Sequence, residues 1–327
     1  MIILSAAEIE KTLTMESAIV ACKDALGYHA KGEATVPLRV NVPVEAHQGQ
    51  ALFMPASVPA ADSLGIKIVS VYPNNVAQGL PAVPAQVIMM NPRTGLVTAM
   101  LEGTSLTRIR TGAVQGAATD VLARPDANIG ALIGTGGQAS GQLEAMLTVR
   151  DLELVKVMDV DFARAQAFAS AESTRLSRFG TRIQAVETSA EAVQDADIIT
   201  AVTISKTAVF DAELIKPGAH VNGMGSYTPE MSEIPQALVR SAGLVAIDTA
   251  DALAESGDLI NPINAGQLSA EDCVPLGEII NGVRPGRQSE EEITFFECVG
   301  SAVLDVVCGQ RVLEQAEAQG MGQNIQI

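Results

Sequence analysis

The chain has 327 residues, of which 21 are Lys or Arg and 38 are Asp or Glu, so its formal net charge is −17. Apolar residues make up 47% of the chain and charged residues 18%, which excludes a disordered protein and provides for a large core. Net negative charge and few aromatic residues argue against nucleic-acid binding, because phosphate contacts need Lys and Arg and base stacking needs aromatic rings. The length is typical of about two domains.

The cysteines, the N-terminus and the apolar runs indicate a cytoplasmic protein that does not span a membrane. Cys22, Cys273, Cys298 and Cys308 form no CxxC pair and have no histidine at metal-ligand spacing, so we expect structural thiols and no metal site. Residues 1–11 have no basic lead before their short apolar run, which argues against a signal peptide. No apolar run approaches the roughly 18 residues that a membrane span needs.

The first third of the chain predicts one helix followed by an antiparallel sheet. Residues 5–31 carry apolar side chains at helical spacing, and Ser5 with Glu8 matches a capping box. Short β-like runs broken by Pro and Gly follow. Residues 91–95 (NPRTG) lie between two such runs and predict a hairpin turn.

The pattern changes near residue 105. Residues 105–123 predict a helix, and apolar strands then alternate with amphipathic helices as far as the strand LVAIDT. This alternation is typical of a parallel, doubly wound sheet. Residues 291–320 predict one long closing helix, because apolar residues recur there at positions i, i+3 and i+4.

A glycine-rich loop, GTGGQA, follows the predicted strand ALIG and precedes helical sequence. Gly134 permits the tight turn of a G-x-G-x-x-A dinucleotide fingerprint, Gly136 admits pyrophosphate, and Ala139 lets the helix pack closely. Asp159 ends the next strand, where a carboxylate accepts hydrogen bonds from the adenosine ribose. The acid repels a 2′-phosphate, so NAD is favoured, while Arg164 nearby keeps NADP possible. The alternative is a plain strand–helix turn followed by a capping Asp.

Several segments in this order resemble the ornithine cyclodeaminase/μ-crystallin family. They are LGIKIVSVYPNN, MLEGTSLTRIRTGAVQGAATDVLA, GTGGQA, KPGAHVNGMGSYTPEMSEI and TFFECVGSAVLDVV, and together they extend over nearly the whole chain. The resemblance implies a homodimer and NAD(P)-dependent chemistry on amino acids: dehydrogenation, imine reduction or cyclodeamination.

The resemblance also implies an α/β fold in which one domain interrupts another. A Rossmann-type doubly wound parallel sheet, residues 121–301, would bind the dinucleotide. It would be inserted in a mixed α+β substrate-binding and dimerisation domain made of residues 1–120 and 302–327.

Arg39, Lys67 and Arg110 fall where the family places substrate contacts, and Lys67 and Arg110 are the expected catalytic residues. Arg110 is expected to open a helix, so that its guanidinium and helix N–H groups bind one carboxylate. Lys67 lies in the apolar run GIKIVSV, where burial would lower its pKa and let it exchange a proton with an imine or amine. The alternatives are a surface charge for Arg110, an outward-facing strand residue for Lys67 and an exposed loop residue for Arg39.

The cofactor contacts expected from the loop and the resemblance lie along the second domain. They are Thr111, Gly134, Gly136, Gly137, Gln138, Ala139, Asp159, Thr203, Ser205, Gly223, Gly225, Val299 and Gly300. The segments 203–205 and 223–225 are expected to line the nicotinamide side.

Two departures from the family pattern bear on the reaction. Ornithine-cyclising members have an Asp where this chain has Tyr227, and a Glu where it has Leu52. Because cyclodeamination needs a carboxylate to manage the δ-amine, the sequence favours an imine reductase, or an L-amino-acid dehydrogenase in the reverse direction. Tyr227 is expected at the substrate, as a cap on an apolar pocket or as a proton donor. The alternatives are an ornithine cyclodeaminase and a non-catalytic NAD(P)-dependent small-ligand-binding protein.

Overall fold

The computed structural model describes residues 1–326 and divides the chain into two units. The first unit combines Met1–Arg110 with Ser301–Ile327, and the second is Thr111–Gly300. The observed division after Arg110 and the expected one after residue 120 both fall within helix α3 (Gly103–Leu122). The assignment of substrate binding and dimerisation to the first unit stays a prediction.

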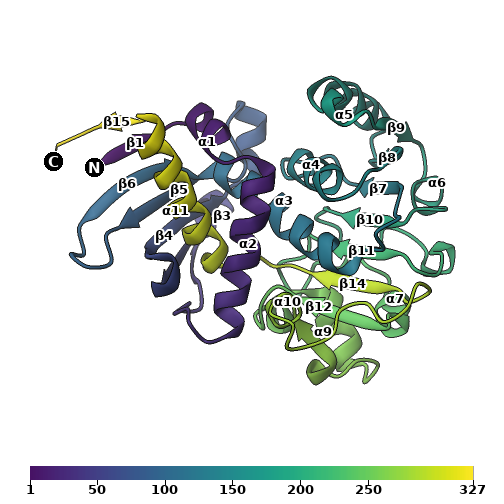
Figure 1. The fold of residues 1–327 in the computed structure, drawn as a ribbon. Coiled ribbons are helices and arrows are strands. Elements are labelled where there is room, and N and C mark those ends of the chain that lie inside the picture. Colours follow the sequence, from purple (N-terminus) through teal and green to yellow (C-terminus); the bar gives the residue numbers. More distant parts are fainter. Residues whose placement is uncertain (327) are drawn as a thin grey trace. The chain divides into compact units, whose positions relative to one another are not determined.

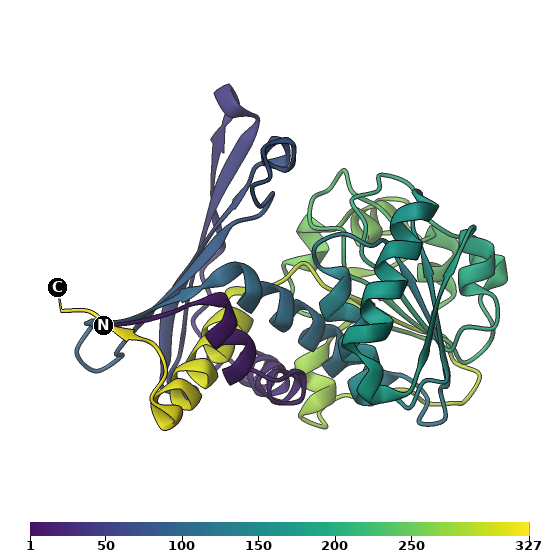
Figure 2. The same cartoon turned by 90° about the horizontal axis from the view of Figure 1, so that it is seen from above.

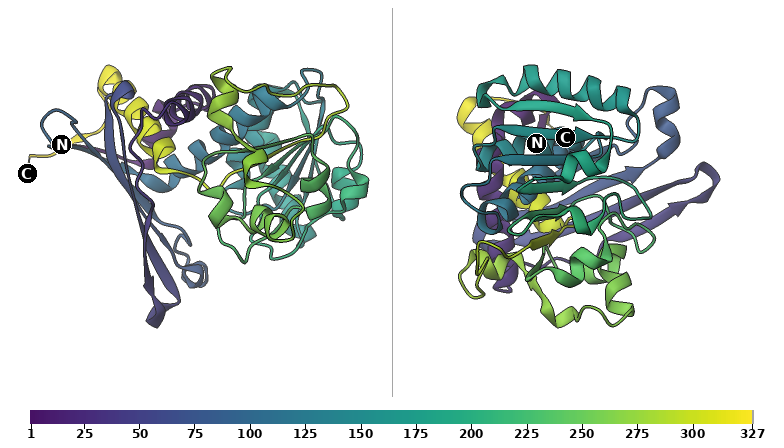
Figure 3. Two further views of the ribbon diagram at one scale, coloured as in Figure 1. Left: turned by 90° about the horizontal axis from the view of Figure 1, so that it is seen from below. Right: turned by 90° about the vertical axis from the view of Figure 1, so that its right-hand side faces the viewer.

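In the first unit, the described strands form a seven-stranded sheet in the order β15-β1-β6-β5-β4-β3-β2. Strands β2 to β6 pair antiparallel with one another, whereas β1 pairs with β6 in parallel, and the predicted turn at 91–95 joins β5 to β6. Pairing of β1 with β15 brings the two chain ends side by side (Figures 1 and 3). The strands are β1 (Ile2–Leu4), β2 (Val40–Val44), β3 (Gly49–Val58), β4 (Ser63–Val71), β5 (Ala85–Met90), β6 (Val97–Glu102) and β15 (Gln323–Asn324).

The leading helix predicted over residues 5–31 is two helices, α1 (Ala6–Thr12) and α2 (Met15–Ala30). The capping box at the start of α1 is confirmed, because the Glu8 carboxylate accepts hydrogen bonds from the backbone N–H and hydroxyl of Ser5. The single-helix prediction is wrong because Thr14 is extended and accepts a hydrogen bond from the Ser17 N–H, which begins a second helix.

The core of the first unit lies on one face of its sheet. Helix α11 (Ala302–Gln319) lies across that face, and α2 packs beside α11 (Figures 1 and 2). A Cβ on Gly309 of α11 would lie 2.8 Å from the Met89 sulfur, so glycine permits this close packing. Alternate strand residues face the helices and are buried, while those between them stay partly exposed.

In the second unit, the described strands form an eight-stranded sheet in the order β13-β12-β14-β11-β10-β7-β8-β9, with every pairing parallel. Helices cover both faces (Figure 3). Ala131 and Ile133 of β7 enter one apolar core and Leu132 between them enters the other. The strands are β7 (Ile129–Ile133), β8 (Leu154–Met158), β9 (Arg182–Val186), β10 (Ile198–Ala201), β11 (His220–Gly223), β12 (Leu244–Ile247), β13 (Cys273–Pro275) and β14 (Thr294–Glu297).

The expected doubly wound parallel sheet inserted in a mixed α+β unit is therefore confirmed. Its helices are α4 (Ala139–Val149), α5 (Phe162–Arg175), α6 (Ser189–Val193), α7 (Gln236–Ser241), α8 (Ala252–Glu255), α9 (Gly257–Asn264) and α10 (Leu276–Ile280), besides the second half of α3.

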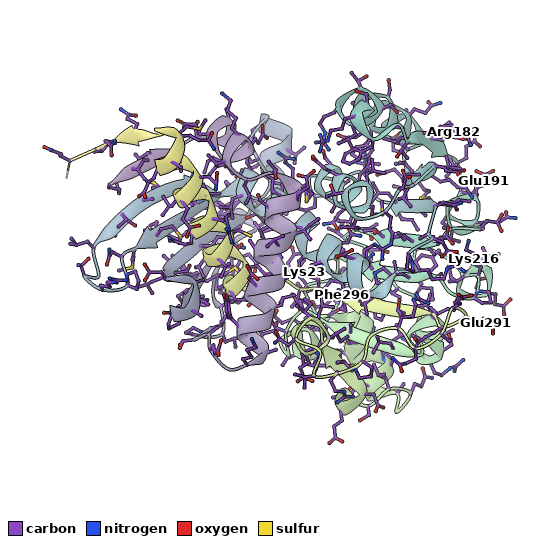
Figure 4. The ribbon with its side chains drawn as sticks, viewed as in Figure 1. Lys23, Arg182, Glu191, Lys216, Glu291 and Phe296 are labelled. Atoms are coloured by element: carbon purple, nitrogen blue, oxygen red, sulfur yellow. The ribbon has the colours of Figure 1, made fainter. Side chains whose placement is uncertain are left out.

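The prediction of one closing helix over residues 291–320 is wrong in its first part. Thr294–Glu297 form the fully buried strand β14 between β11 and β12, and the helix begins only at Ala302. Phe296, labelled in Figure 4, belongs to this strand. A strand buried on both faces reads as a continuous apolar run, which periodicity does not separate from a buried helix.

All four cysteines are free and buried. Within residues 1–326, no helix has the length and apolar composition that a membrane crossing requires. The same residues contain no group of three or more His, Cys, Asp or Glu side chains arranged to hold a metal ion.

Candidate functional site

Lys67 is a buried cation inside the first unit. It lies on β4, opposite Met54 of β3 and Val87 of β5, and only 2% of it is exposed. Its Nζ is 2.7 Å from Oδ2 of Asp305, on α11. Since β4 is an interior strand and Lys67 faces the helices, the outward-facing alternative is excluded. Burial lowers the pKa of Lys67 to about 8, to which Arg110 contributes and which Asp305 opposes.

Arg110 meets the same carboxylate. Its Nε donates a hydrogen bond of 2.8 Å to the other oxygen of Asp305, and its side chain is almost fully buried. The prediction that Arg110 opens a helix is wrong, because it is the eighth residue of α3 (Gly103–Leu122). Main-chain N–H groups in a helix interior already bond within the helix, so only the guanidinium remains for a ligand. The surface-charge alternative is excluded by its burial.

Asp305 joins the two cations, and it was missed from the sequence. It is completely buried in α11 and bridges Lys67 and Arg110. Half-buried Arg39, just before β2, completes what we call the basic cluster, and its charge also lowers the pKa of Lys67. Three cations and one anion leave a net positive charge, which favours binding of a small anion.

The glycine-rich loop has the geometry that its fingerprint requires. Gly134 has φ +97°, and a Cβ there would lie 2.8 Å from the Val202 carbonyl oxygen. At Gly136 and Gly137 an added Cβ would meet nothing within 4 Å, so the backbone is open to a phosphate group. Ala139 is fully buried in the core under α4. Helix α4 follows directly and directs its N-terminal N–H groups to the loop.

A cavity of about 610 Å³ opens beside this loop, and we call it the loop cavity. Its size falls in the range of ligand-binding pockets. Val160 (93% exposed) and Ile204 (80% exposed), both missed from the sequence, lie in its wall and provide apolar surfaces suited to an adenine ring. Of the expected cofactor contacts, the cavity is lined by Gly134, Gly136, Asp159, Thr203 and Ser205, and not by Thr111, Gly137, Gln138, Ala139, Gly223, Gly225, Val299 or Gly300.

Asp159 lies at the end of β8 as expected, and its oxygens are engaged within the protein. Oδ2 accepts hydrogen bonds from the N–H (2.9 Å) and hydroxyl (2.6 Å) of Thr135. Oδ1 accepts from the Asp161 N–H and from Arg164 at 2.6 Å. These hydrogen bonds lower the pKa of Asp159 although burial opposes them, so the carboxylate is ionised and holds the glycine-rich loop.

The remaining expected contacts are distributed over the second unit, with Thr111 inside helix α3. Gly223 ends β11, and the Gly300 N–H donates to Oδ2 of Asp248 at 2.8 Å. Thr111 and Val299 are buried. Tyr227 is partly buried against the core of this unit, and burial raises the pKa of its hydroxyl.

Comparison with known proteins gives concordant results. Residues 1–320 match the model of the ornithine cyclodeaminase/mu-crystallin family. The chain is 38% identical to a Delta(1)-pyrroline-2-carboxylate reductase of Bacillus cereus, over 100% of both chains. The structure of Thermococcus litoralis Delta(1)-pyrroline-2-carboxylate reductase in complex with NADH and L-proline superposes with a TM-score of 0.94 at 36% identity, covering 99% of this chain and 100% of the other. An archaeal alanine dehydrogenase dimer with bound NAD gives a TM-score of 0.90 at 33% identity, covering 99% and 98%.

Proposed function

Because the chain belongs to the ornithine cyclodeaminase/mu-crystallin family, we propose that it is an NAD-dependent imine reductase acting on a small cyclic imino acid of the pyrroline-2-carboxylate type. The reverse reaction is the dehydrogenation of the corresponding amino acid. The observation that carries the proposal is the basic cluster, in which Lys67 and Arg110 share one buried carboxylate.

The first task of the basic cluster is to bind the substrate carboxylate. Lys67, Arg110 and Arg39 concentrate positive charge around Asp305, and this charge attracts an anionic group of the substrate. A guanidinium presents several N–H donors in a fixed plane, which matches a carboxylate. We assign carboxylate binding to Arg110 and Arg39, which leaves Lys67 for the imine nitrogen.

The second task is proton transfer. Reduction of C=N adds a hydride to carbon and a proton to nitrogen, and a bound reduced nicotinamide supplies the hydride. The Lys67 ammonium gives the proton, and neutral Lys67 takes it back in the reverse direction. A lysine whose pKa is lowered to about 8 performs both near neutral pH. The Asp305 carboxylate lies 2.7 Å from the Lys67 Nζ and so fixes the position of the amino group that transfers the proton.

The second unit binds the dinucleotide through the loop cavity. Open backbone at Gly136 accepts the pyrophosphate, and the apolar wall of Val160 and Ile204 accepts the adenine. We propose that NADH is preferred over NADPH, because ionised Asp159 at the end of β8 repels a 2′-phosphate. Its ion pair with Arg164 reduces this preference.

Position 52 favours a substrate without a distal amine. Leu52 on β3 is buried on the same face as Lys67, diagonally across from it on the neighbouring strand. An apolar side chain there packs against methylene groups and offers no partner to a δ-ammonium. This supports imine reduction over ornithine cyclodeamination.

We also propose that the protein is a homodimer that pairs through the outer face of the first sheet. A row of partly exposed apolar side chains crosses four strands in register: Pro55, Ile66, Ile88 and Met100. Val40 and Val42 on the edge strand β2 are also exposed. A continuous apolar face of this kind is typical of an interface.

NADH oxidation with pyrroline-2-carboxylate, piperideine-2-carboxylate, or pyruvate plus ammonia tests the function. We expect turnover with at least one cyclic imine. Conversion of ornithine to proline without net change in NADH would establish the cyclodeaminase instead. NADH binding with no turnover of any imine or corresponding amino acid would establish the binding protein.

A further inference from the structure

Glu233 is a fully buried carboxylate that joins two loops at the carboxyl edge of the parallel sheet. Its Oε2 accepts hydrogen bonds from the N–H (2.7 Å) and the hydroxyl (2.7 Å) of Thr203, which follows β10. Its Oε1 accepts from the N–H groups of Gly225 (2.6 Å) and Met224 (3.2 Å), which follow β11. One side chain therefore fixes both strand-end loops with four hydrogen bonds.

The two loops are packed too closely for a side chain to lie between them. A Cβ on Gly225 would lie 2.0 Å from the carbonyl oxygen of Thr203. Thr203 and Ser205 of the first loop also line the loop cavity, and the same loop touches the glycine-rich turn, where a Cβ on Gly134 would meet Val202. Any shift of Thr203 away from Glu233 therefore moves the cavity wall.

The groups around Glu233 are acidic, so they oppose its ionisation. A carboxylate that only stabilised the fold would be expected to have a cation as its partner. The charge of Glu233 interacts unfavourably with Asp258 of α9 and Glu297 of β14, and Glu297 in turn interacts unfavourably with Asp248, which follows β12. By contrast, Asp197 at the other end of β10 is also buried and also accepts two backbone N–H groups, but it is paired with Arg124 and Lys216. Lys216 is labelled in Figure 4. A buried carboxylate with acidic neighbours, such as Glu233, is typical of functional sites.

We propose that Glu233 is a positioning residue: it holds the loops after β10 and β11 in the arrangement that binds the dinucleotide, and only its ionised form does so. Three of its four donors are backbone N–H groups, which cannot accept a hydrogen bond, so a proton on Oε1 displaces one of them, and a proton on Oε2 reverses the hydrogen bond that the Thr203 hydroxyl donates. The inference rests on the proposed NADH-dependent function and deepens it.

The pH dependence follows from this arrangement. Burial raises the pKa of Glu233 to about 7; Asp258 adds to the rise, while the hydrogen bonds from Thr203 and Gly225 oppose it. The ionised, binding form is present above this pKa and is lost as the pH falls through it. We therefore expect the affinity for NADH to decrease as the pH falls through about 7.

The first test is Glu233→Gln, with NADH affinity measured by fluorescence and KM and kcat by NADH oxidation. Glutamine keeps one acceptor and turns an NH2 group toward the N–H donors of one loop. We expect Kd and KM for NADH to rise about tenfold, the scale of an unsatisfied buried polar group, with the KM for the imine changed much less. The matched control is Asp197→Asn, on the same strand, which should lower the unfolding temperature and leave the NADH Kd unchanged.

A second variant tests the inference even if E233Q does not fold. Asp258→Asn keeps the Oδ1 acceptor of Ser232 and Ile234 while removing the charge that raises the pKa of Glu233. The midpoint of NADH affinity against pH should move to lower pH. The inference is overturned, and the proposed function is not, by any of three results: an unmoved pH midpoint in D258N, wild-type NADH affinity in E233Q, or a loss of NADH affinity in D197N equal to that in E233Q. Failure of the wild-type protein to bind NADH overturns the proposed function, and the inference with it.

Discussion

Lys67 and Arg110 are both buried, and their like charges would repel each other without an anion between them. Asp305 contacts Lys67 at 2.7 Å and Arg110 at 2.8 Å and so permits both to be buried. At the scale of single residues, the two cations that share this carboxylate differ in one respect. The Arg110 guanidinium is always charged, whereas the Lys67 amine can lose its proton. In the proposed mechanism, function and stability therefore depend on the same three side chains.

Replacing Lys67 by Met removes the proton donor while keeping the side-chain length. We expect kcat for imine reduction to fall by about 100-fold or more, the usual contribution of a positioned general acid. The KM for NADH should stay unchanged, because Lys67 is assigned to the imine nitrogen and is not among the residues that line the loop cavity. Lys11→Met, at an exposed position of α1, is the control and should retain full activity. Wild-type kcat in K67M would remove Lys67 from the mechanism.

The two reaction directions should respond to pH with opposite signs. Reduction needs the ammonium form of Lys67, which exists below its pKa of about 8, so the reduction rate should fall as the pH rises through this value. Oxidation of the amino acid needs the neutral amine and should rise over the same range. Steady-state rates against pH at saturating substrate check this. A reduction rate that rises with pH there would contradict the assignment.

At the scale of elements, α11 brings the acid to the basic cluster. Asp305→Asn keeps the shape of the side chain but removes the negative charge that contacts Lys67 and Arg110. We expect the free energy of unfolding to fall by about 3–5 kcal/mol, as when one partner of a buried ion pair is removed. Because Asp305 raises the pKa of Lys67, the fall in reduction rate should also move to lower pH.

Chemical denaturation and a pH–rate profile measure the two effects of D305N. Glu314→Gln removes an exposed carboxylate from the same helix and should change neither. Loss of stability with an unmoved pH profile would restrict Asp305 to a structural role.

Elements were predictable from the sequence where apolar residues recur at a regular spacing or where a short motif marks a turn or a cap. The alternation after residue 105 correctly indicated the parallel sheet, and the glycine spacing located the loop with its left-handed Gly134. The strand Thr294–Glu297 was not predictable, because its four residues are all buried and are too few to show a period of their own beside the neighbouring helix. The break at Thr14 also depended on a local hydrogen bond that competes with helix continuation.

The candidate site was partly predictable for a related reason. Lys67 attracted attention as a lone cation in an apolar strand, and Asp305 gives the same signal as the only acid in AVLDVV. Neither segment shows by itself that the two side chains meet, because they are far apart in sequence. The expectation that Arg110 opens a helix conflicted with the helix predicted over residues 105–123, and the structure supports the latter: the Glu102 carboxylate accepts hydrogen bonds from the N–H groups of Thr104 and Ser105 at the start of α3.

At the scale of the whole molecule, the charge of −17 contrasts with the positive basic cluster inside it. Two copies of an acidic chain repel each other, so a dimer needs an interface that is apolar. The outer face of the first sheet meets this requirement, since its central row consists of Pro55, Ile66, Ile88 and Met100. Salt screens the repulsion between exposed charges and leaves apolar contacts intact, so added salt should not dissociate the dimer.

Ile66→Lys tests this interface directly. Ile66 is partly exposed at the centre of the row, and its neighbours across the sheet are Pro55 and Ile88. A lysine there would remain hydrated in the monomer but would have to lose its water in an apolar interface, so we expect the variant to be monomeric where the wild type is dimeric. Size-exclusion chromatography with light scattering measures the mass, and circular dichroism confirms that the fold is kept. Val283→Lys, which places the same charge on an exposed valine of the second unit, should leave the wild-type mass unchanged. A dimeric I66K would exclude this sheet face as the interface, and a monomeric wild type would exclude the dimer itself.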